Sequence, residues 1–175
     1  MTPELRERAR GVRLLVLDVD GVLTDGRLYY GDDGVEVKAF HIHDGLGLRM
    51  LMASGVQVAI ITGRSSRAVE LRAANLGIAH VQQQVGDKLA AFEQLLSRLG
   101  LSTASAAAMG DDLPDLPVLH RCRFAACVPE APAVVRRYAH YVTHRPGGAG
   151  AVREVCGLLL AAQGTLEARV REYLK

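Results

Sequence analysis

The amino-acid sequence predicts an α/β protein whose core is a doubly wound parallel sheet. Short continuous apolar runs alternate with segments of helical periodicity, and each run ends abruptly at polar residues. The segments between the runs are about 10–15 residues long, as in parallel βαβ units. The chain has 175 residues, about the length of one domain, so we expect a single domain over residues 1–175.

Four apolar runs are expected to form buried strands, because a strand covered by helices on both faces needs no polar alternation. They are Val12–Leu17, Val56–Ile61, Ala106–Met109 and Phe124–Val128. Helical spacing predicts helices over Gly45–Ser54, Ser65–Leu76, Lys88–Leu99, Leu113–His120 and Ala149–Ala162. Leu166–Leu174 also has helical character, and we expect the charged tail, about residues 163–175, to become ordered in an assembly.

A β-hairpin interrupts this alternation directly after the first strand, over about residues 27–40. Arg27–Tyr30 and Val35–Phe40 flank the turn Gly31-Asp32-Asp33-Gly34. An isolated hairpin is marginal in water, and one small domain offers little cover for its apolar side chains. We therefore expect the hairpin to project from the domain and to pack against another subunit.

Composition excludes several classes of function. The 21 basic and 19 acidic residues are scattered, and the chain has no Trp, three Phe and five Tyr, so we expect no nucleic acid partner. Three cysteines without a CxxC pair argue against a disulfide framework or a zinc site. The N-terminus is polar and no apolar run approaches the ~18 residues of a membrane span, so we expect a cytoplasmic protein with no membrane contact.

Polar side chains gather where the predicted strands end. Asp18, Asp20 and Thr24 follow the first strand, Thr62, Gly63 and Arg64 follow the second, and Asp111, Asp112 and Asp115 follow the third. Lys88 opens a helix and is able to reach the same edge. Ligands of open α/β sheets bind beyond the carboxyl ends of the strands, so we expect one site here. Clustered carboxylates repel one another unless a cation holds them, and oxygen ligands favour Mg²⁺.

These residue types together indicate phosphate chemistry. Mg²⁺ and Lys88 would neutralise phosphate oxygens, and Thr62 with backbone N–H groups would hydrogen-bond them. Of two aspartates in one loop, the first would attack phosphorus and the second would give a proton to the leaving alcohol. Each of these side chains alone is common at helix caps, turns or surfaces. The whole set, in order at the ends of strands and helices, indicates a site.

The motifs resemble those of the haloacid dehalogenase (HAD) superfamily of phosphatases. Asp18-Val19-Asp20-Gly21-Val22-Leu23-Thr24 is similar to the first motif, and Thr62-Gly63-Arg64, Lys88 and Gly110-Asp111-Asp112-Leu113-Pro114-Asp115 are similar to the second, third and fourth. Longer segments resemble the family of 3-deoxy-D-manno-octulosonate 8-phosphate (KDO 8-phosphate) phosphatases: VDGVLTDGRLYY, KAFHIHDGLGLR, VAIITGRSS, GDDLPDLPVL and GGAGAVREVCGLLLAAQG. The resemblance implies a Rossmannoid sheet and a Mg²⁺-dependent phosphoric monoester hydrolase of lipopolysaccharide precursor synthesis.

The resemblance also implies roles for the aspartates. Asp18 would be the nucleophile that forms an aspartyl-phosphate, and Asp20 would be the general acid and then the base. Mg²⁺ would be bound by the side chains of Asp18 and Asp111 and by the backbone carbonyl of Asp20.

Phosphoryl and substrate contacts follow from the same resemblance. Thr62 and Lys88 would hold the phosphoryl group, with either Asp115 or Asp112 orienting Lys88. Substrate contacts would come from His41, His43, Asp44, Gly45, Arg49, Gly63, Arg64 and Arg72. Cationic side chains suit a sugar acid that carries both a carboxylate and a phosphate.

The spacing of the motifs leaves no room for a cap domain. Between Asp18 and Thr62 there is space for the hairpin, one helix and one strand, and between Thr62 and Lys88 for a helix and a strand. Yet an aspartyl-phosphate has to be shielded from bulk water. We therefore expect a capless enzyme whose neighbouring subunits close each site, in a homotetramer as the family implies.

Two positions depart from the family pattern and leave the substrate open. His43 stands where the segment Asn-Val-Arg-Asp-Gly commonly has arginine, and Ala149 stands where Gly-Gly-Arg-Gly is common. Fewer fixed charges would weaken carboxylate binding or favour a related acid, such as a nine-carbon ulosonate 9-phosphate. The equal alternative is that the family tolerates both residues without a change of substrate.

Two non-enzymatic alternatives belong to other classes of protein. A receiver-like signalling domain also uses Asp, Thr, Lys and Mg²⁺, but here Asp18 and Asp20 share one loop and a hairpin follows. A phosphatase-like module that serves only oligomerisation is disfavoured because every catalytic-type position is filled.

Overall fold

Six parallel strands form the central sheet of the computed structural model, which describes residues 1–174. In chain order they are β1 (Leu14–Leu17), β4 (Gln57–Ile61), β5 (His80–Gln82), β6 (Ala106–Gly110), β7 (Phe124–Cys127) and β8 (Tyr141–Val142). Their order in the sheet is β5-β4-β1-β6-β7-β8. Because β1 lies between β4 and β6, the chain leaves β1 toward one side and later returns to the other. Such a reversal opens a crevice beyond the carboxyl ends of the strands.

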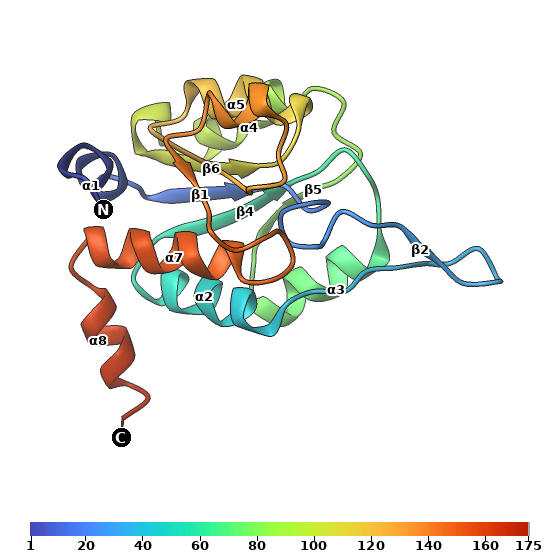
Figure 1. Cartoon of the computed structure of the whole chain (residues 1–175), viewed down its shortest axis with the longest axis horizontal. Helices are drawn as coiled ribbons and strands as arrows, with labels where there is room; N and C mark the ends of the chain where they lie inside the picture. The colour runs from blue at the N-terminus through green and yellow to red at the C-terminus, as the bar shows by residue number, and fades with distance from the viewer. Residues whose placement is uncertain (175) are drawn as a thin grey trace.

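Helices cover both faces of the sheet, as Figure 1 shows. One face carries α4 (Lys88–Leu99), the 3₁₀ turn η2 (Leu113–Asp115) and α5 (Leu116–Arg121). The other carries α2 (Ile42–Ala53), α3 (Arg67–Leu76) and α7 (Ala151–Ala162), with α2 and α7 packed side by side. The remaining helices are α1 (Pro3–Arg10), η1 (Thr103–Ser105), α6 (Ala133–Arg136) and α8 (Leu166–Arg171). The predicted doubly wound α/β fold is confirmed, and no cap domain is evident within residues 1–174.

Local signals fix the helix that carries Lys88. The side chain of Asp87 caps α4 by accepting the N–H of Ala90 at 3.0 Å. Gly100 ends the helix in the left-handed conformation, at φ 62°. Phe92 is fully buried, which holds α4 to the core and leaves its first residue at the edge where the strands end.

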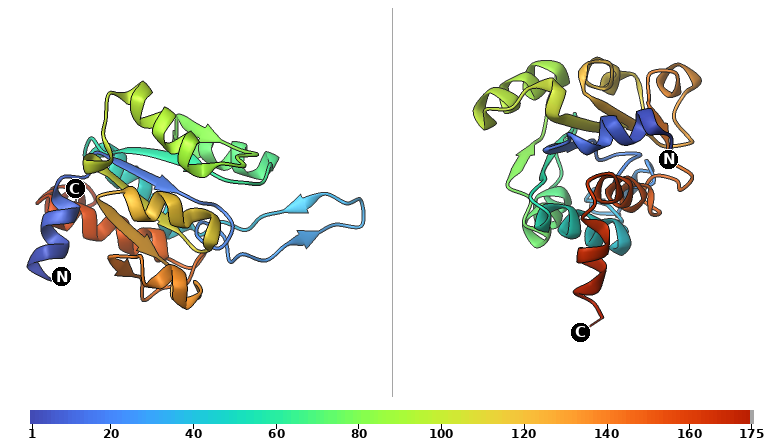
Figure 2. Two further views of the ribbon diagram at one scale, coloured as in Figure 1. Left: turned by 90° about the horizontal axis from the view of Figure 1, so that it is seen from above. Right: turned by 90° about the vertical axis from the view of Figure 1, so that its left-hand side faces the viewer.

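The predicted hairpin is also confirmed. Its strands β2 (Tyr29–Tyr30) and β3 (Glu36–Val37) pair antiparallel, and the loop extends well away from the domain (Figure 2). Its large apolar side chains Leu28, Tyr29, Tyr30, Val35 and Val37 are all exposed. A partner subunit for this surface stays a prediction.

The structure adds elements that the apolar pattern did not predict. Strands β5 and β8 and helices α1 and α6 are short or half-buried. Helix α2 begins at Ile42 rather than at Gly45. The predicted tail contains α8, which follows a left-handed Gly164 at φ 70°. Within residues 1–174 no helix has the length and apolar character needed to span a membrane.

Candidate active site

The polar residues that follow β1, β4 and β6 meet in one cavity of about 470 Å³. The predicted site residues that line it are Asp18, Asp20, Thr62, Gly63, Arg64, Lys88 and Asp111. They come from segments far apart in the sequence, and the parallel sheet brings them to one edge because all its strands end there.

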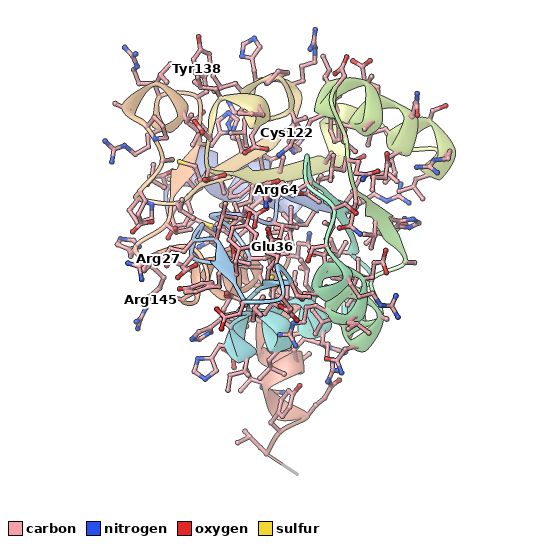
Figure 3. All side chains as sticks on the ribbon, turned by 90° about the vertical axis from the view of Figure 1, so that its right-hand side faces the viewer. Arg27, Glu36, Arg64, Cys122, Tyr138 and Arg145 are labelled. Atoms are coloured by element: carbon pink, nitrogen blue, oxygen red, sulfur yellow. The ribbon has the colours of Figure 1, made fainter. Side chains whose placement is uncertain are left out.

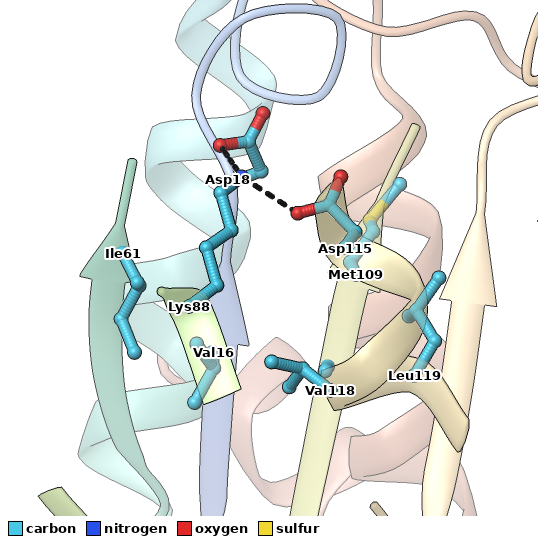
Figure 4. Close-up of a pocket in the computed structure, with 9 residues that line it drawn as sticks. Val16, Asp18, Ile61, Lys88, Met109, Asp115, Val118 and Leu119 are labelled. Atoms are coloured by element: carbon cyan, nitrogen blue, oxygen red, sulfur yellow. Dashed lines mark hydrogen bonds and ion pairs between the residues drawn. The ribbon is translucent and has the colours of Figure 1, made fainter. Parts of the chain in front are cut away.

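Lys88 links two aspartates that also line this cavity, and the dashed lines in Figure 4 mark the two contacts. Its Nζ lies 2.6 Å from Oδ1 of Asp18 and 2.7 Å from Oδ1 of Asp115. Asp18 directly follows β1, and its N–H donates to the carbonyl of Met109 in β6 at 3.1 Å. All three charged side chains are more than nine-tenths buried. The nucleophile predicted from the sequence is therefore held from both its backbone and its side chain.

Asp115, and not Asp112, is the residue that orients Lys88. The second oxygen of Asp115 accepts the backbone N–H groups of Asp111 and Asp112 at 3.0 and 3.3 Å. Asp112 instead caps η2, with its Oδ1 accepting the N–H of Leu113 at 2.8 Å. Asp115 thus ties the loop after β6 to the lysine.

Burial and mutual repulsion shift the acid–base behaviour of the cluster. Burial, reinforced by Asp115, raises the pKa of Asp18 to about 6 although Lys88 opposes the change. Burial, together with Asp18, raises the pKa of Asp111 to about 7. Burial disfavours the charge of Lys88, but Asp18 and Asp115 outweigh it, and the pKa of Lys88 is raised. The cluster carries more negative charge than one lysine offsets.

These carboxylates fit a hard divalent cation. Oxygens of Asp18, Asp111 and Asp115 lie within 4.8 Å of one another. Both oxygens of Asp115 already accept hydrogen bonds, which leaves Asp18 and Asp111 as the available donors. The chain makes room for Asp111 at Gly21, where φ is 90° and a Cβ would overlap its Oδ2. Oxygen donors without His or Cys favour Mg²⁺.

Asp20 lines the same cavity and belongs to a second group of charges, of which Figure 3 labels Glu36 and Arg64. Its Oδ1 accepts a hydrogen bond from Lys38, whose Nζ also lies 2.9 Å from Oε1 of Glu36. Arg64 pairs with Glu36 and lies 3.7 Å from Oδ2 of Asp20. Burial disfavours the charge of Lys38, yet Asp20 and Glu36 raise its pKa overall.

Glu36 and Lys38 were not singled out by sequence analysis. A signal was present, because residues two apart in a strand project from the same face. Their contact with Asp20 depends on how the base of the hairpin packs, which the sequence pattern does not give.

The other predicted substrate contacts do not line this cavity. They are His41, His43, Asp44, Gly45, Arg49 and Arg72, and they surround the N-terminal end of α2.

Arg49 and Arg72 line a hollow of about 220 Å³, here called the α2 hollow, together with Ile42, Gly45 and Leu46. Arg49 donates to the carbonyl of Asn75 at 2.7 Å and Arg72 to that of His41 at 3.2 Å. Within residues 1–174 neither guanidinium has a carboxylate partner. Burial and the neighbouring Arg49 lower the pKa of Arg72. The pair offers an anion a cationic surface.

His41 and His43 face a different hollow of about 400 Å³, which Arg145 and Arg153 also line. The two imidazole rings meet edge to face, with centroids 4.9 Å apart. Asp44 is buried beside it, and its Oδ1 accepts the N–H of Arg153 at 2.7 Å near the start of α7. Burial raises the pKa of Asp44. Its observed contact is with the protein, and contact with substrate stays a prediction.

Comparison with known proteins agrees with the geometry of the site. Residues 77–153 match the family of haloacid dehalogenase-like hydrolases. The 3-deoxy-D-manno-octulosonate 8-phosphate phosphatase KdsC of Salmonella typhimurium is 48% identical over 167 residues, which cover 95% of this chain and 89% of that protein.

Solved structures extend the agreement over the whole fold. The KDO 8-phosphate phosphatase of Moraxella catarrhalis, in complex with magnesium, phosphate and KDO, has a TM-score of 0.97 and 43% identity over 99% of each chain. The Yersinia pestis enzyme has a TM-score of 0.94 and 46% identity over 95% of this chain and 90% of its own. The chain belongs to the KDO 8-phosphate phosphatase family of haloacid dehalogenase-like hydrolases.

Proposed function

We propose that this single-domain chain is a cytoplasmic, Mg²⁺-dependent phosphatase that hydrolyses KDO 8-phosphate to KDO and phosphate for lipopolysaccharide precursor synthesis. The observation that carries the proposal is Asp18 itself. This buried carboxylate lies at the floor of a cavity, is held by Lys88 at 2.6 Å, and has Asp111 beside it and Asp20 on the wall. The names of the relatives supply the substrate.

The reaction would proceed in two displacements. First the Asp18 carboxylate attacks phosphorus, the bond from phosphorus to the sugar oxygen breaks, and Asp20 gives its proton to that oxygen. Water then attacks the aspartyl-phosphate, Asp20 takes the proton from the water, and phosphate leaves with Asp18 restored. Lys88 and the hydroxyl of Thr62 would stabilise the phosphoryl oxygens throughout.

Mg²⁺ would be held by the carboxylates of Asp18 and Asp111 and by the backbone carbonyl of Asp20. When bound, it would supply positive charge that neutralises the phosphoryl oxygens. Asp115 orients Lys88, and this contact keeps the positive charge of the lysine beside the nucleophile Asp18.

Recognition of the sugar acid would rest on side chains around α2 and on a second copy of the chain. His41, His43, Asp44, Gly45, Arg49 and Arg72 are the proposed contacts, with Gly63 and Arg64 at the cavity. A homotetramer joined through the exposed hairpins would let a neighbouring copy cover the cavity and shield it from water. Light scattering tests this: we expect about four times the 18.8 kDa chain mass, and a monomer would contradict it.

The function is tested by phosphate release, with and without Mg²⁺, from KDO 8-phosphate, a nine-carbon ulosonate 9-phosphate and simple hexose phosphates. We expect a strong preference for KDO 8-phosphate. Preference for the nine-carbon acid would keep the mechanism and change the substrate, with His43 the first residue to vary. No release from any compound by the folded, metal-loaded protein would overturn the proposal.

The nucleophile is tested by Asp18→Asn. We expect a loss of roughly 10⁴-fold or more in turnover, because removal of a nucleophile leaves only binding and electrostatic effects. Asp32→Asn, which removes the same charge from the exposed hairpin turn, is the matched control. Substantial turnover by a folded Asp18→Asn protein would assign the attack to another group.

A further inference from the structure

We propose that Lys38 is a positioning residue that fixes the carboxylate of Asp20 for proton transfer. The inference rests on the proposed function and deepens it, because it assigns a task to a lysine at the base of the hairpin. It also makes the docking of that hairpin a condition for efficient catalysis.

The first support is the burial of Lys38. Its side chain is 2% exposed, although lysine is almost never fully buried without a partner. Its Nζ donates to Oδ1 of Asp20 and lies 2.9 Å from Oε1 of Glu36. Removing an ammonium group from water is costly, so two carboxylates are needed to offset that cost. A solvated surface lysine would show neither feature.

The second support is that the contacts close into a ring of alternating charge. Asp20 contacts Lys38, Lys38 contacts Glu36, Glu36 contacts Arg64, and Arg64 returns to Asp20. Three separate segments supply these four side chains: the loop after β1, the base of the hairpin and the loop after β4. The side chain of Arg64 is 45% exposed, whereas those of Asp20 and Glu36 are 19% and 15% exposed, so solvent screens the contacts of Lys38 less than those of Arg64.

The third support is the unequal state of the two oxygens of Asp20. Oδ1 accepts the hydrogen bond from Lys38, whereas Oδ2 is buried and has no hydrogen-bond partner within residues 1–174. A buried carboxylate oxygen without a hydrogen bond is unfavourable, and Arg64, whose Nε lies 3.7 Å from Oδ2, is too far away to donate one. Asp20 lines the substrate cavity, so a bound leaving group is able to satisfy Oδ2. Lys38 thereby selects which oxygen is presented to the substrate.

A comparison of leaving groups separates positioning from a merely structural role. The sugar oxygen of an alkyl phosphate has to be protonated as it leaves, whereas p-nitrophenolate is stable without a proton. A misplaced general acid therefore slows alkyl esters much more than aryl esters. General loss of structure slows both alike.

The test uses Lys38→Met, which keeps most of the length of the side chain and removes its charge. We expect kcat for KDO 8-phosphate to fall at least about tenfold more than kcat for p-nitrophenyl phosphate, since a general acid contributes about 10²–10⁴-fold. We expect KM for p-nitrophenyl phosphate to change little. An equal fall for both substrates, or no fall, would overturn the inference.

Two further variants test whether misfolding or the loss of a positive charge alone explains the effect of Lys38→Met. Glu36→Gln weakens one anchor of Lys38 and should give the same selective loss on a smaller scale. Arg27→Met removes a positive charge from the exposed side of the same hairpin and should leave both substrates unaffected. If Arg27→Met reproduces the loss, hairpin charge and not the contact with Asp20 is responsible.

Crystal structures of the wild type and of Lys38→Met show the position of Asp20 independently of any activity measurement. We expect the carboxylate of Asp20 to rotate or to occupy several positions in the variant. An unchanged carboxylate would overturn the positioning role. Failure of the wild type to release phosphate from KDO 8-phosphate would instead overturn the proposed function, and the structures would still decide the role of Lys38.

Discussion

The acidic cluster (Asp18, Asp111, Asp115 and Lys88) and the α2 hollow differ in how complete they are within one chain. In the cluster, Lys88 bridges two carboxylates at 2.6 and 2.7 Å, and the loop after β6 is tied to one of them. In the α2 hollow, the hydrogen-bond partners of Arg49 and Arg72 within residues 1–174 are carbonyl and amide oxygens, and no carboxylate pairs with either.

Under the proposed function, this difference separates the chemistry of the reaction from recognition of the substrate. Cleavage of a phosphate ester needs the same few groups for any substrate, and buried strand ends hold those groups rigidly. Recognition of one sugar acid needs charges that the substrate itself neutralises, so these charges lack partners until it binds. The cluster should therefore tolerate almost no change, whereas changes at the α2 hollow should affect the affinity for one class of substrate.

Lys88→Met should have the largest effect. It leaves Asp18 and Asp115 buried without their shared cation, and breaking a buried pair in this way costs about 3–5 kcal/mol of stability. Loss of a preorganised charge at the phosphoryl group should also lower kcat by roughly 10²–10³-fold. Chemical denaturation and steady-state kinetics measure the two effects. Arg98→Met, on the exposed end of the same helix, is the control, and similar losses there would mean that α4 and not the cluster is sensitive.

Gly21→Ala should weaken metal binding without touching a catalytic side chain. A Cβ there overlaps Oδ2 of Asp111, so the carboxylate has to move. Displacing a ligand in this way should raise the Mg²⁺ concentration for half-maximal activity by about 10–100-fold. Gly34→Ala, at the hairpin turn, also has a positive φ of 76° but contacts nothing within 4 Å. Gly34→Ala therefore introduces similar backbone strain without a clash. Equal changes in the Mg²⁺ requirement of the two variants would show that displacement of Asp111 is not the cause.

The cluster was far easier to predict from the sequence than the charges around it. The order of Asp18, Thr62, Lys88 and Asp111 along the chain coincides with strand ends, and a parallel sheet brings strand ends together whatever the loops do. Glu36 lies in strand β3 and Lys38 follows that strand at the base of the hairpin. The position of the hairpin depends on long-range packing, so the contact of these residues with Asp20 could not be predicted.

The missed elements have a similar physical cause. Strand β5 (His80–Gln82) lies at the sheet edge and is only half-buried, so it carries no apolar run. Helix α1 is mostly polar and buries only Leu5 and Ala9. It depends on its cap, where Thr2 accepts the N–H of Leu5 at 3.2 Å, and on Pro3. Where burial is partial, hydrophobic periodicity gives little signal.

Arg72→Gln should affect recognition and leave the chemistry intact. A hydrogen bond to a charged group is worth about 1.5–3 kcal/mol, so KM for KDO 8-phosphate should rise at least about tenfold. Turnover of p-nitrophenyl phosphate should stay unchanged, because that ester has no carboxylate. Arg67→Gln, at the start of the same helix and paired with Glu70, is the control. An equal loss of activity toward KDO 8-phosphate and p-nitrophenyl phosphate would mean that Arg72 acts in catalysis. The contrast between the acidic cluster and the α2 hollow would then fail.

The smallest expected effect is on stability, and it is specific to the cluster. An acid whose pKa is raised on folding binds its proton more tightly in the folded state, so stability falls as pH rises from the unfolded pKa to the folded one. For Asp111 that interval runs from the ordinary aspartate pKa of 3.8 to a pKa of about 7. Asp111→Asn removes this penalty. We therefore expect the melting temperature of the variant in EDTA, minus that of the wild type, to rise between pH 5 and 8. Each kcal/mol of difference in stability corresponds to about 2–4 °C.

Saturating Mg²⁺ should reverse the sign of this difference in melting temperature. The wild type is then stabilised because it binds the cation through a carboxylate that Asp111→Asn lacks. A difference that stays flat with pH in EDTA would show that Asp111 carries no such penalty. The acidic cluster would then be as open to solvent as the α2 hollow, and the contrast drawn between the two regions would fail.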